Sequence, residues 1–262
     1  MAVWTPSSIV TLTTDFGLAG SYVGALRGAV LSAYIGAQLV DITNQIPVQD
    51  VREAARVLVL ASAAYPAGTV HCVVVDPGVG TDRTPVVVWA DGHVFVGPDN
   101  GVFGPVADRA DEVHLFRITN PDVLAPHISS TFHGRDIFGP VAGAIAGGLA
   151  PSLVGPEIIG LVALDEPKSV VLAESTRGEV VAVDHFGNLL SNIRFETVPS
   201  GATVCINGVV IDQLVTSYGH LAPGSLAFLA SSDGMLEIAV TNGSAADRLA
   251  VSRGASVVVS TS

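Results

Sequence analysis

Hydrophobic and polar positions follow two alternating periodicities in the first part of the chain. Short β-branched runs, typical of buried strands, are separated by longer stretches with apolar residues at helical spacing. This pattern predicts strands at 8–13, 38–42 and 69–75 and helices at 20–35 and 50–64. Because parallel strands are joined by crossover connections, the alternation indicates a parallel sheet with helices packed on its faces.

The same unit is predicted to continue through a hairpin, a strand and a helix. The hairpin covers 85–96 and turns at Asp91-Gly92, a strong hairpin signal. A strand is expected at 113–118 and a helix at 134–149. The pattern then loosens over 151–169, where prolines and a short charged patch occur, and we place a domain boundary there.

The remaining chain changes character, because its apolar runs are short and are separated by Gly-Asn, Asn-Gly, Pro-Gly and Asp-Gly turn signals. Such spacing predicts an all-β domain, a small barrel or a sandwich. The expected strands are 179–183, 189–193, 203–206, 209–211, 226–230, 236–240 and 256–260. The predicted fold is therefore an N-terminal α/β domain (1–166) with a mostly parallel sheet and a smaller, barrel-like all-β domain (167–262).

Composition narrows the class of protein. The chain has 262 residues, of which 49% are hydrophobic and 14% charged, and this excludes intrinsic disorder. Its formal net charge of -12 disfavours partners that carry many phosphates, so neither nucleic acid nor an anionic membrane is expected. The two cysteines lie among Val and Ile and are expected to be buried thiols. The first residues show no signal-peptide pattern, so we expect a cytoplasmic location.

Candidate chemistry is concentrated at predicted strand ends and turns. No nucleophile elbow, phosphate-binding P-loop or HExxH zinc motif is present, and no metal site is expected. Asp15 and Asp76 each follow a predicted strand, at the edge of the sheet where ligands of α/β proteins bind. Asp76 also opens a glycine-rich loop that ends at Arg83, and His133 precedes a predicted helix. From these local patterns alone, an ordinary salt bridge and a capping or core histidine remain open.

Five separated motifs occur in order along nearly the whole chain. They are Thr13-Thr14-Asp15-Phe16-Gly17, Val75-Asp76-Pro77-Gly78-Val79-Gly80, Gly97-Pro98-Asp99-Asn100-Gly101, Phe132-His133-Gly134-Arg135-Asp136 and Asp184-His185-Phe186-Gly187-Asn188. Together they resemble the motifs of the S-adenosylmethionine (SAM) hydroxide adenosyltransferases. That family is related to the SAM-dependent fluorinase and chlorinase.

The resemblance implies an assembly and a reaction. The assembly is a homotrimer whose active sites lie at subunit interfaces, between the N-terminal domain of one subunit and the C-terminal domain of the next. The reaction converts SAM and water to adenosine and L-methionine, with SAM as a substrate and with no cofactor. Alternatives are a halide (chloride) adenosyltransferase and a non-catalytic protein that binds SAM or adenosine.

The resemblance also implies site residues. The water-activating set falls on Asp76, Arg83 and His133, and the aspartate that holds the ribose hydroxyls falls on Asp15. The other implied substrate contacts are Phe186 and Asn188 to adenine, and Asp184, Ser232 and Glu237 to the methionine end. Water must lose a proton as it bonds to carbon, whereas a halide needs no base. The presence of Asp, Arg and His together therefore favours hydrolysis over halide transfer.

Overall fold

The computed structural model describes residues 3–261, and this part of the chain divides into two compact units between Asp165 and Glu166. The first unit contains a six-stranded sheet in the order β2-β1-β3-β5-β4-β6. β1 pairs in parallel with β2 and β3, and β3 pairs in parallel with β5, whereas β4 is antiparallel to both β5 and β6. The strands are β1 (Ile9–Thr14), β2 (Gln38–Thr43), β3 (Val70–Val74), β4 (Pro85–Ala90), β5 (His93–Pro98) and β6 (Val113–Arg117).

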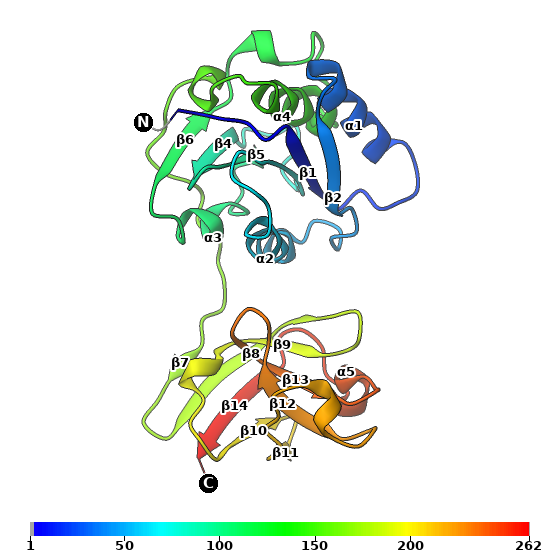
Figure 1. Ribbon diagram of the computed structural model, residues 1–262, viewed down its shortest axis with the longest axis vertical. Coiled ribbons are helices and arrows are strands. Elements are labelled where there is room, and N and C mark those ends of the chain that lie inside the picture. Colours follow the sequence, from blue (N-terminus) through cyan, green and yellow to red (C-terminus); the bar gives the residue numbers. More distant parts are fainter. Residues whose placement is uncertain (1–2, 262) are drawn as a thin grey trace. The chain divides into compact units, whose positions relative to one another are not determined.

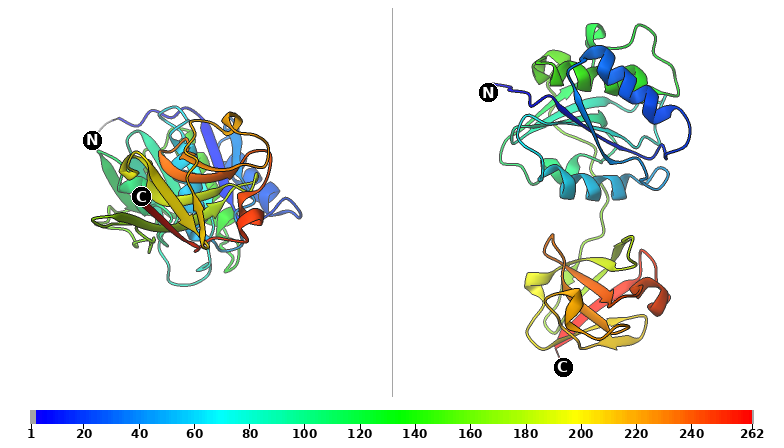
Figure 2. Two further views of the ribbon diagram at one scale, coloured as in Figure 1. Left: turned by 90° about the horizontal axis from the view of Figure 1, so that it is seen from below. Right: turned by 45° about the vertical axis from the view of Figure 1, so that its right-hand side comes forward.

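Helices cover both faces of this sheet (Figure 1 and Figure 2). One buried cluster packs the sheet against α1 (Tyr22–Ala33) and α4 (Gly139–Ala146), and another packs it against α2 (Val51–Ser62) and α3 (Gly104–Ala107). The central strands are buried on both faces, and every residue of β3 is buried, whereas the edge strands β2 and β6 are more exposed. This is the arrangement that a βαβ rhythm dictates, because a central parallel strand needs an apolar neighbour on each side.

The predicted turn at Asp91-Gly92 is confirmed, and the helix predicted at 134–149 differs at both its start and its end. Asp91 and Gly92 have φ values of 46° and 79°, as the two-residue turn between β4 and β5 requires. The helix expected at 134–149 begins with a π-helical turn, η2 (Gly134–Phe138), and α4 ends at Ala146. It ends early because Gly148 adopts a φ of 110°, which stops helical propagation.

The second unit is an eight-stranded, almost closed antiparallel sheet in the order β11-β10-β14-β8-β9-β13-β12, with β7 paired to β8. Phe228 of β12 accepts from Val215 and donates to Gln213, so the segment after β11 approaches the last strand and nearly closes the barrel. A buried apolar cluster fills its interior. The strands are β7 (Val170–Val171), β8 (Ser175–Val183), β9 (Leu189–Arg194), β10 (Ala202–Ile206), β11 (Val209–Ile211), β12 (Leu226–Ala230), β13 (Met235–Val240) and β14 (Ser256–Thr261).

The predicted fold class is confirmed, an α/β unit followed by a barrel-like β unit. The patterns missed several one-turn helices, because they are too short for a periodicity to register. These are α3 (Gly104–Ala107), η1 (Pro121–Val123), η3 (Pro151–Val154), η4 (Phe195–Thr197), η5 (Tyr218–His220) and α5 (Ala245–Leu249). Within residues 3–261, no helix has the length and apolar character needed to cross a membrane.

Both cysteines are free; burial raises the pKa of the Cys72 thiol to about 12, and Cys205 is half-buried.

Candidate active site

Two predicted site residues leave the sheet at the same edge. β1 and β3 are parallel neighbours with Thr14 paired to Val74, and Asp15 and Asp76 follow the carboxyl ends of these strands. Asp15 is half-buried, and its Oδ2 accepts the backbone N–H of Gln49 at 2.8 Å. The other carboxylate oxygen has no hydrogen bond to any residue of the described chain. Asp15 therefore keeps acceptor capacity beyond its single bond to the protein.

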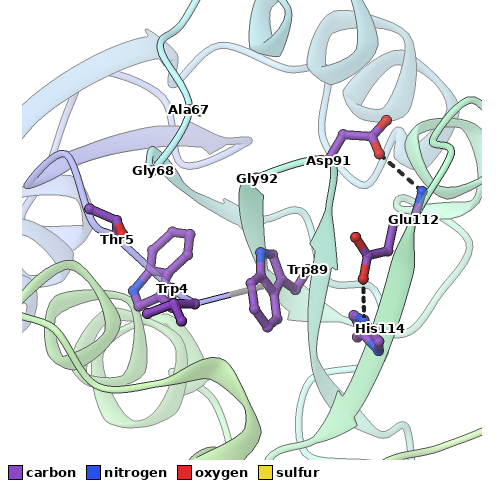
Figure 3. Close-up of a pocket in the computed structure, with 10 residues that line it drawn as sticks. Trp4, Thr5, Ala67, Gly68, Trp89, Asp91, Gly92, Glu112 and His114 are labelled. Atoms are coloured by element: carbon purple, nitrogen blue, oxygen red, sulfur yellow. Dashed lines mark hydrogen bonds and ion pairs between the residues drawn. The ribbon is translucent and has the colours of Figure 1, made fainter. Parts of the chain in front are cut away.

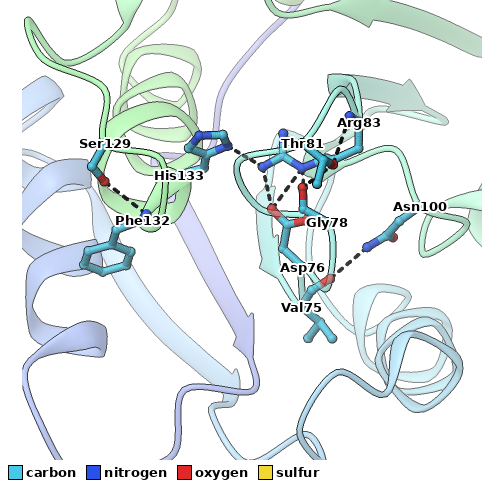
Figure 4. Close-up of polar contacts among 9 residues, drawn as sticks. All are labelled: Val75, Asp76, Gly78, Thr81, Arg83, Asn100, Ser129, Phe132 and His133. Carbon is cyan, nitrogen blue, oxygen red and sulfur yellow. Dashed lines mark hydrogen bonds and ion pairs between the residues drawn. The ribbon is translucent and has the colours of Figure 1, made fainter.

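Asp76 and Arg83 form a nearly buried ion pair (Figure 4). Arg83 Nε lies 3.0 Å from Asp76 Oδ1 and 2.9 Å from Oδ2, and Arg83 Nη2 lies 2.5 Å from Oδ2. Only 5% of the Asp76 side chain and 9% of the Arg83 side chain are exposed. The guanidinium carbon also lies 5.0 Å from the centre of the Phe138 ring. A charge pair this well shielded acts more strongly on a nearby reacting group than an exposed pair does.

The loop that brings Arg83 back to Asp76 depends on two glycines. A Cβ on Gly78 would lie 3.0 Å from the Arg83 side chain. Gly80 has a φ of 77°, and a Cβ there would come within 2.3 Å of the Ser130 carbonyl oxygen. The backbone of this loop can therefore approach the segment before His133 only because position 80 has no side chain.

His133 completes the cluster, because its Nδ1 lies 2.6 Å from Arg83 Nη2. A guanidinium only donates hydrogen bonds, so Nδ1 must be the acceptor and a neutral ring carries its proton on Nε2. Burial and the neighbouring Arg83 lower the pKa of His133, while Asp76, Asp136 and a hydrogen bond with the Ser129 backbone act in the opposite direction. The net direction favours neutral imidazole near pH 7.

Asp136 holds the segment that carries His133. Its side chain is 3% exposed, and its Oδ2 accepts the backbone N–H of Ser129 at 2.8 Å. Ser129 Oγ in turn accepts the backbone N–H of Phe132 at 3.1 Å. The polar side chains of His133, Arg135 and Asp136 are thus all hydrogen-bonded, either within their own segment or to Arg83. Asp136 is a supporting residue that the sequence patterns did not single out as one.

In the β unit, Asp184 organises the turn that carries Asn188. Asp184 Oδ1 accepts the backbone N–H groups of Phe186 and Asn188, and its Oδ2 accepts the Asn188 side-chain amide at 2.9 Å. The Phe186 ring is 75% exposed beside this turn. An amide has two donors and one carbonyl, so Asn188 retains a donor and its acceptor for a ligand.

Glu237 is the other buried candidate of this unit. It lies on β13, is 3% exposed, and accepts the Tyr218 hydroxyl at 2.8 Å. Burial, Asp184 and Asp233 raise the pKa of Glu237, and the bond from Tyr218 lowers it. Tyr218 was missed by the sequence patterns, because it lies in a short, irregular segment without periodicity. Ser232 is exposed in the turn before β13.

A separate small cavity lies at the opposite edge of the α/β sheet, where its parallel strands begin (Figure 3). Its volume is about 150 Å³, and Trp4, Trp89, Asp91, Glu112 and His114 are among its lining residues. The two indole rings meet edge to face at 6.1 Å. None of the predicted site residues lines this cavity, so it is distinct from the Asp76 cluster.

Two family models match the chain, and together they cover most of it. The SAM hydroxide adenosyltransferase N-terminal domain matches residues 10–155, and the C-terminal domain of that family matches residues 178–258. The five motifs and the Asp76 cluster lie inside these matched regions.

Individual relatives agree with the family models. A protein named (R)-S-adenosyl-L-methionine hydrolase from Salinispora tropica is 38% identical over 255 residues, covering 95% of this chain and 96% of its own. A fluorinase from Actinoplanes sp. is 25% identical over 212 residues, 71% of each chain. The crystal structure of an uncharacterized conserved protein from Thermotoga maritima matches with a TM-score of 0.90 and 35% identity, covering 96% of this chain and 99% of that one. The chain therefore belongs to the SAM hydroxide adenosyltransferase family.

Proposed function

We propose that this protein hydrolyses SAM to adenosine and L-methionine by in-line attack of an activated water at the ribose C5′. The observation that carries the proposal is the hydrogen-bonded Asp76–Arg83–His133 cluster beside Asp15 at the carboxyl edge of the sheet, with the Asp76 and Arg83 side chains nearly buried. Relatives at 34–38% identity over most of the chain are named (R)-S-adenosyl-L-methionine hydrolase, which supports the same reaction.

The chemistry of the leaving group indicates that the proposed catalytic cluster acts on the attacking water and not on the departing sulfur. The C5′–S bond of a sulfonium breaks to give a neutral thioether, so the leaving group needs no general acid and the reaction needs no cofactor. The attacking water must release a proton as the C5′–O bond forms, and a positioned base or cation assists that step. Arg83 stays protonated and would stabilise developing hydroxide.

Asp76 is the better candidate for the proton acceptor. Nδ1 of His133 is occupied by Arg83, and a neutral His133 carries its proton on the other nitrogen. A carboxylate has about four lone-pair sites, so Asp76 can hold Arg83 and still accept a proton from water. In this scheme His133 positions Arg83, and Asp76 receives the proton.

The substrate contacts divide between the two units. In the α/β unit, Asp15 would accept hydrogen bonds from both ribose hydroxyls through its remaining oxygen capacity. The proposed contacts in the β unit are Phe186 stacked on adenine, Asn188 hydrogen-bonded to its edge, and Asp184, Ser232 and Glu237 at the methionine end.

Product analysis tests the reaction. The protein is incubated with SAM in halide-free buffer prepared with ¹⁸O-labelled water, and products are separated by chromatography with mass detection. We expect adenosine that carries the label in its 5′-hydroxyl, with methionine in equal amount. Intact SAM would indicate a binding protein, and a 5′-halogenated nucleoside formed only after chloride addition would indicate halide transfer.

A matched pair of variants tests the cluster. Asp76→Asn removes the proposed base, and Asp82→Asn removes an exposed carboxylate of the same loop. We expect the first to slow single-turnover hydrolysis by about 10²–10⁴-fold and the second to leave it unchanged. Equal rates for Asp76→Asn and wild type would contradict the role of Asp76.

We also propose a homotrimer with active sites at subunit interfaces, supported by the division of the substrate residues between two units. Light scattering measures the assembly. Mixing an inactive Asp76→Asn protein with an inactive Asn188→Ala protein, after dissociation and reassembly, should restore activity, because some sites then combine two intact halves. No recovery in reassembled trimers would contradict shared sites.

The free thiols support a reducing, cytoplasmic location, which cell fractionation checks.

A further inference from the structure

The β unit contains a carboxylate in an unusual environment, Glu237, which is proposed above to lie at the methionine end. Glu237 is 3% exposed, and its partners on the neighbouring strands are Leu190 of β9 and Leu229 of β12. Tyr218 donates to Oε1, and no described residue donates a hydrogen bond to Oε2. Oε2 is not among the fully enclosed polar atoms that lack a partner, so it can accept a hydrogen bond from a bound group.

The charged residues that act on Glu237 are all negative. Asp184 and Asp233 are the charged residues that act on Glu237, and both raise its pKa. Tyr218 also senses Glu237 and Asp184, and its own pKa is raised to about 12, chiefly by burial. Every charged group that acts on this pair within the described chain is thus a carboxylate. The local potential attracts an ammonium group and repels a carboxylate.

We propose that this end of the site recognises the ammonium group of the substrate tail and not its carboxylate, so that the protein also hydrolyses adenosyl sulfonium compounds whose aminoalkyl tail has no carboxylate. The inference rests on the proposed function and names its substrate class. An ammonium has three donors, and Oε2 of Glu237 offers it a charged acceptor. The substrate carboxylate contributes little binding free energy here, because it faces like charges.

The chemical step is the same for such a substrate. Water forms the C5′–O bond and loses one proton, while the electron pair of the C5′–S bond leaves with sulfur. The products are adenosine, a neutral thioether that bears the ammonium group, and one released proton.

Three substrates that differ only in the tail test the proposal on the wild-type protein. SAM carries ammonium and carboxylate, decarboxylated SAM carries ammonium alone, and 5′-deoxy-5′-(dimethylsulfonio)adenosine carries neither. We expect kcat/KM for decarboxylated SAM to lie within about tenfold of that for SAM. The dimethylsulfonio compound should be slower by about 10- to 100-fold, as expected for the loss of a charged hydrogen bond.

Two outcomes overturn the inference. One is a decarboxylated substrate as poor as the dimethylsulfonio compound, since recognition would then depend on the carboxylate. The other is a dimethylsulfonio compound as good as SAM, since the tail would then not be recognised. Calorimetric binding of the three compounds to the Asp76→Asn protein measures recognition without turnover. Failure of hydrolysis itself is therefore distinguishable from failure of this inference.

Glu237→Gln locates the recognition. It preserves shape and removes the charge, and Glu196→Gln, at a side chain 74% exposed in the same unit, is the matched control. We expect Glu237→Gln to raise KM for both ammonium-bearing substrates by about 10- to 100-fold, with the dimethylsulfonio compound unaffected. Equal losses for all three compounds would indicate a general structural defect and contradict the assignment. Thermal melting of both variants monitors folding.

Discussion

At the scale of single residues, the contact between Arg83 and His133 distinguishes two possible roles for His133 in the proposed reaction. Arg83 occupies Nδ1 of His133, so the imidazole can hold the guanidinium without taking a proton there. A residue with this role is replaceable by another acceptor of similar reach, whereas a general base is not.

Substitutions of His133 separate these two roles. Asn can place its carbonyl oxygen near the position of Nδ1 and accept from Arg83, whereas Ala cannot. We expect His133→Ala to slow single-turnover hydrolysis by about 10²–10⁴-fold and His133→Asn to retain a rate within about tenfold of wild type. If the Asn variant is as slow as the Ala variant, His133 takes the proton itself.

In the proposed ammonium site, Tyr218 is a positioning residue, because its hydroxyl stabilises the ionised form of Glu237. The hydrogen bond from Tyr218 lowers the pKa of Glu237, against burial and the carboxylates of Asp184 and Asp233, which raise it. Removing the hydroxyl in Tyr218→Phe should therefore raise that pKa further. The charged form is then lost at a higher pH.

The expected result is a shift of the acidic limb of the kcat/KM profile for SAM to higher pH, with kcat at saturation nearly unchanged. Tyr65→Phe is the control, because the Tyr65 ring packs edge-on against His71 in the α/β unit. An unshifted limb in Tyr218→Phe would rule out this role.

At the scale of elements, the loop between β3 and β4 connects the sheet to the segment that carries His133. Gly80 permits this contact through its positive φ and its close approach to Ser130. Ala at position 80 combines a strained backbone with a clash, so the loop must move away and take Arg83 with it.

We expect Gly80→Ala to lower kcat at least about tenfold, because small displacements of catalytic groups are costly. Gly208→Ala is the matched control: its φ of 76° is equivalent, and a Cβ there meets no atom within 4 Å. The control should lose stability by about 1 kcal/mol and keep its kcat. Equal kcat values for the two variants would show that the Gly80 contact does not position the cluster.

At the scale of the whole molecule, tryptophan fluorescence can report the unfolding of the α/β unit, and a buried histidine should make its free energy of unfolding depend on pH. The only two tryptophans of the chain, Trp4 and Trp89, lie in this unit. His71 is fully buried in the sheet, where Thr11 and His93 are its hydrogen-bond partners. Burial, followed by the influence of His93, lowers the pKa of His71 to about 3.

Because the unfolded chain binds a proton at His71 below about pH 6.5 and the folded chain does not, stability must fall as the pH falls. We expect the free energy of unfolding of the α/β unit, measured by tryptophan fluorescence in urea, to decrease by about 2 kcal/mol between pH 7 and pH 5. His71→Asn should flatten this dependence even if it lowers stability at every pH. The same slope in the variant would assign the effect to other groups.

Local features were predictable because they depend on neighbours in sequence. The strand and helix periods, the Asp91-Gly92 turn and the placement of Asp15 and Asp76 at strand ends all follow from backbone geometry and burial patterns. The catalytic and substrate roles of the site residues came from the resemblance of five motifs, and those roles stay predictions.

The sequence by itself therefore determined the two-domain fold class, the family and the edge of the sheet where Asp15 and Asp76 lie. Only the tertiary structure decided that Arg83 occupies His133 Nδ1, that Asp136 supports the His133 segment and that Tyr218 holds Glu237. The Arg83–His133 and Tyr218–Glu237 bonds join residues 50 and 19 positions apart. Arg83 lies in a loop and Tyr218 in a one-turn helix, where no periodicity constrains side-chain direction. Such contacts depend on how loops pack after the elements have formed, and a pattern along the chain carries no record of that packing.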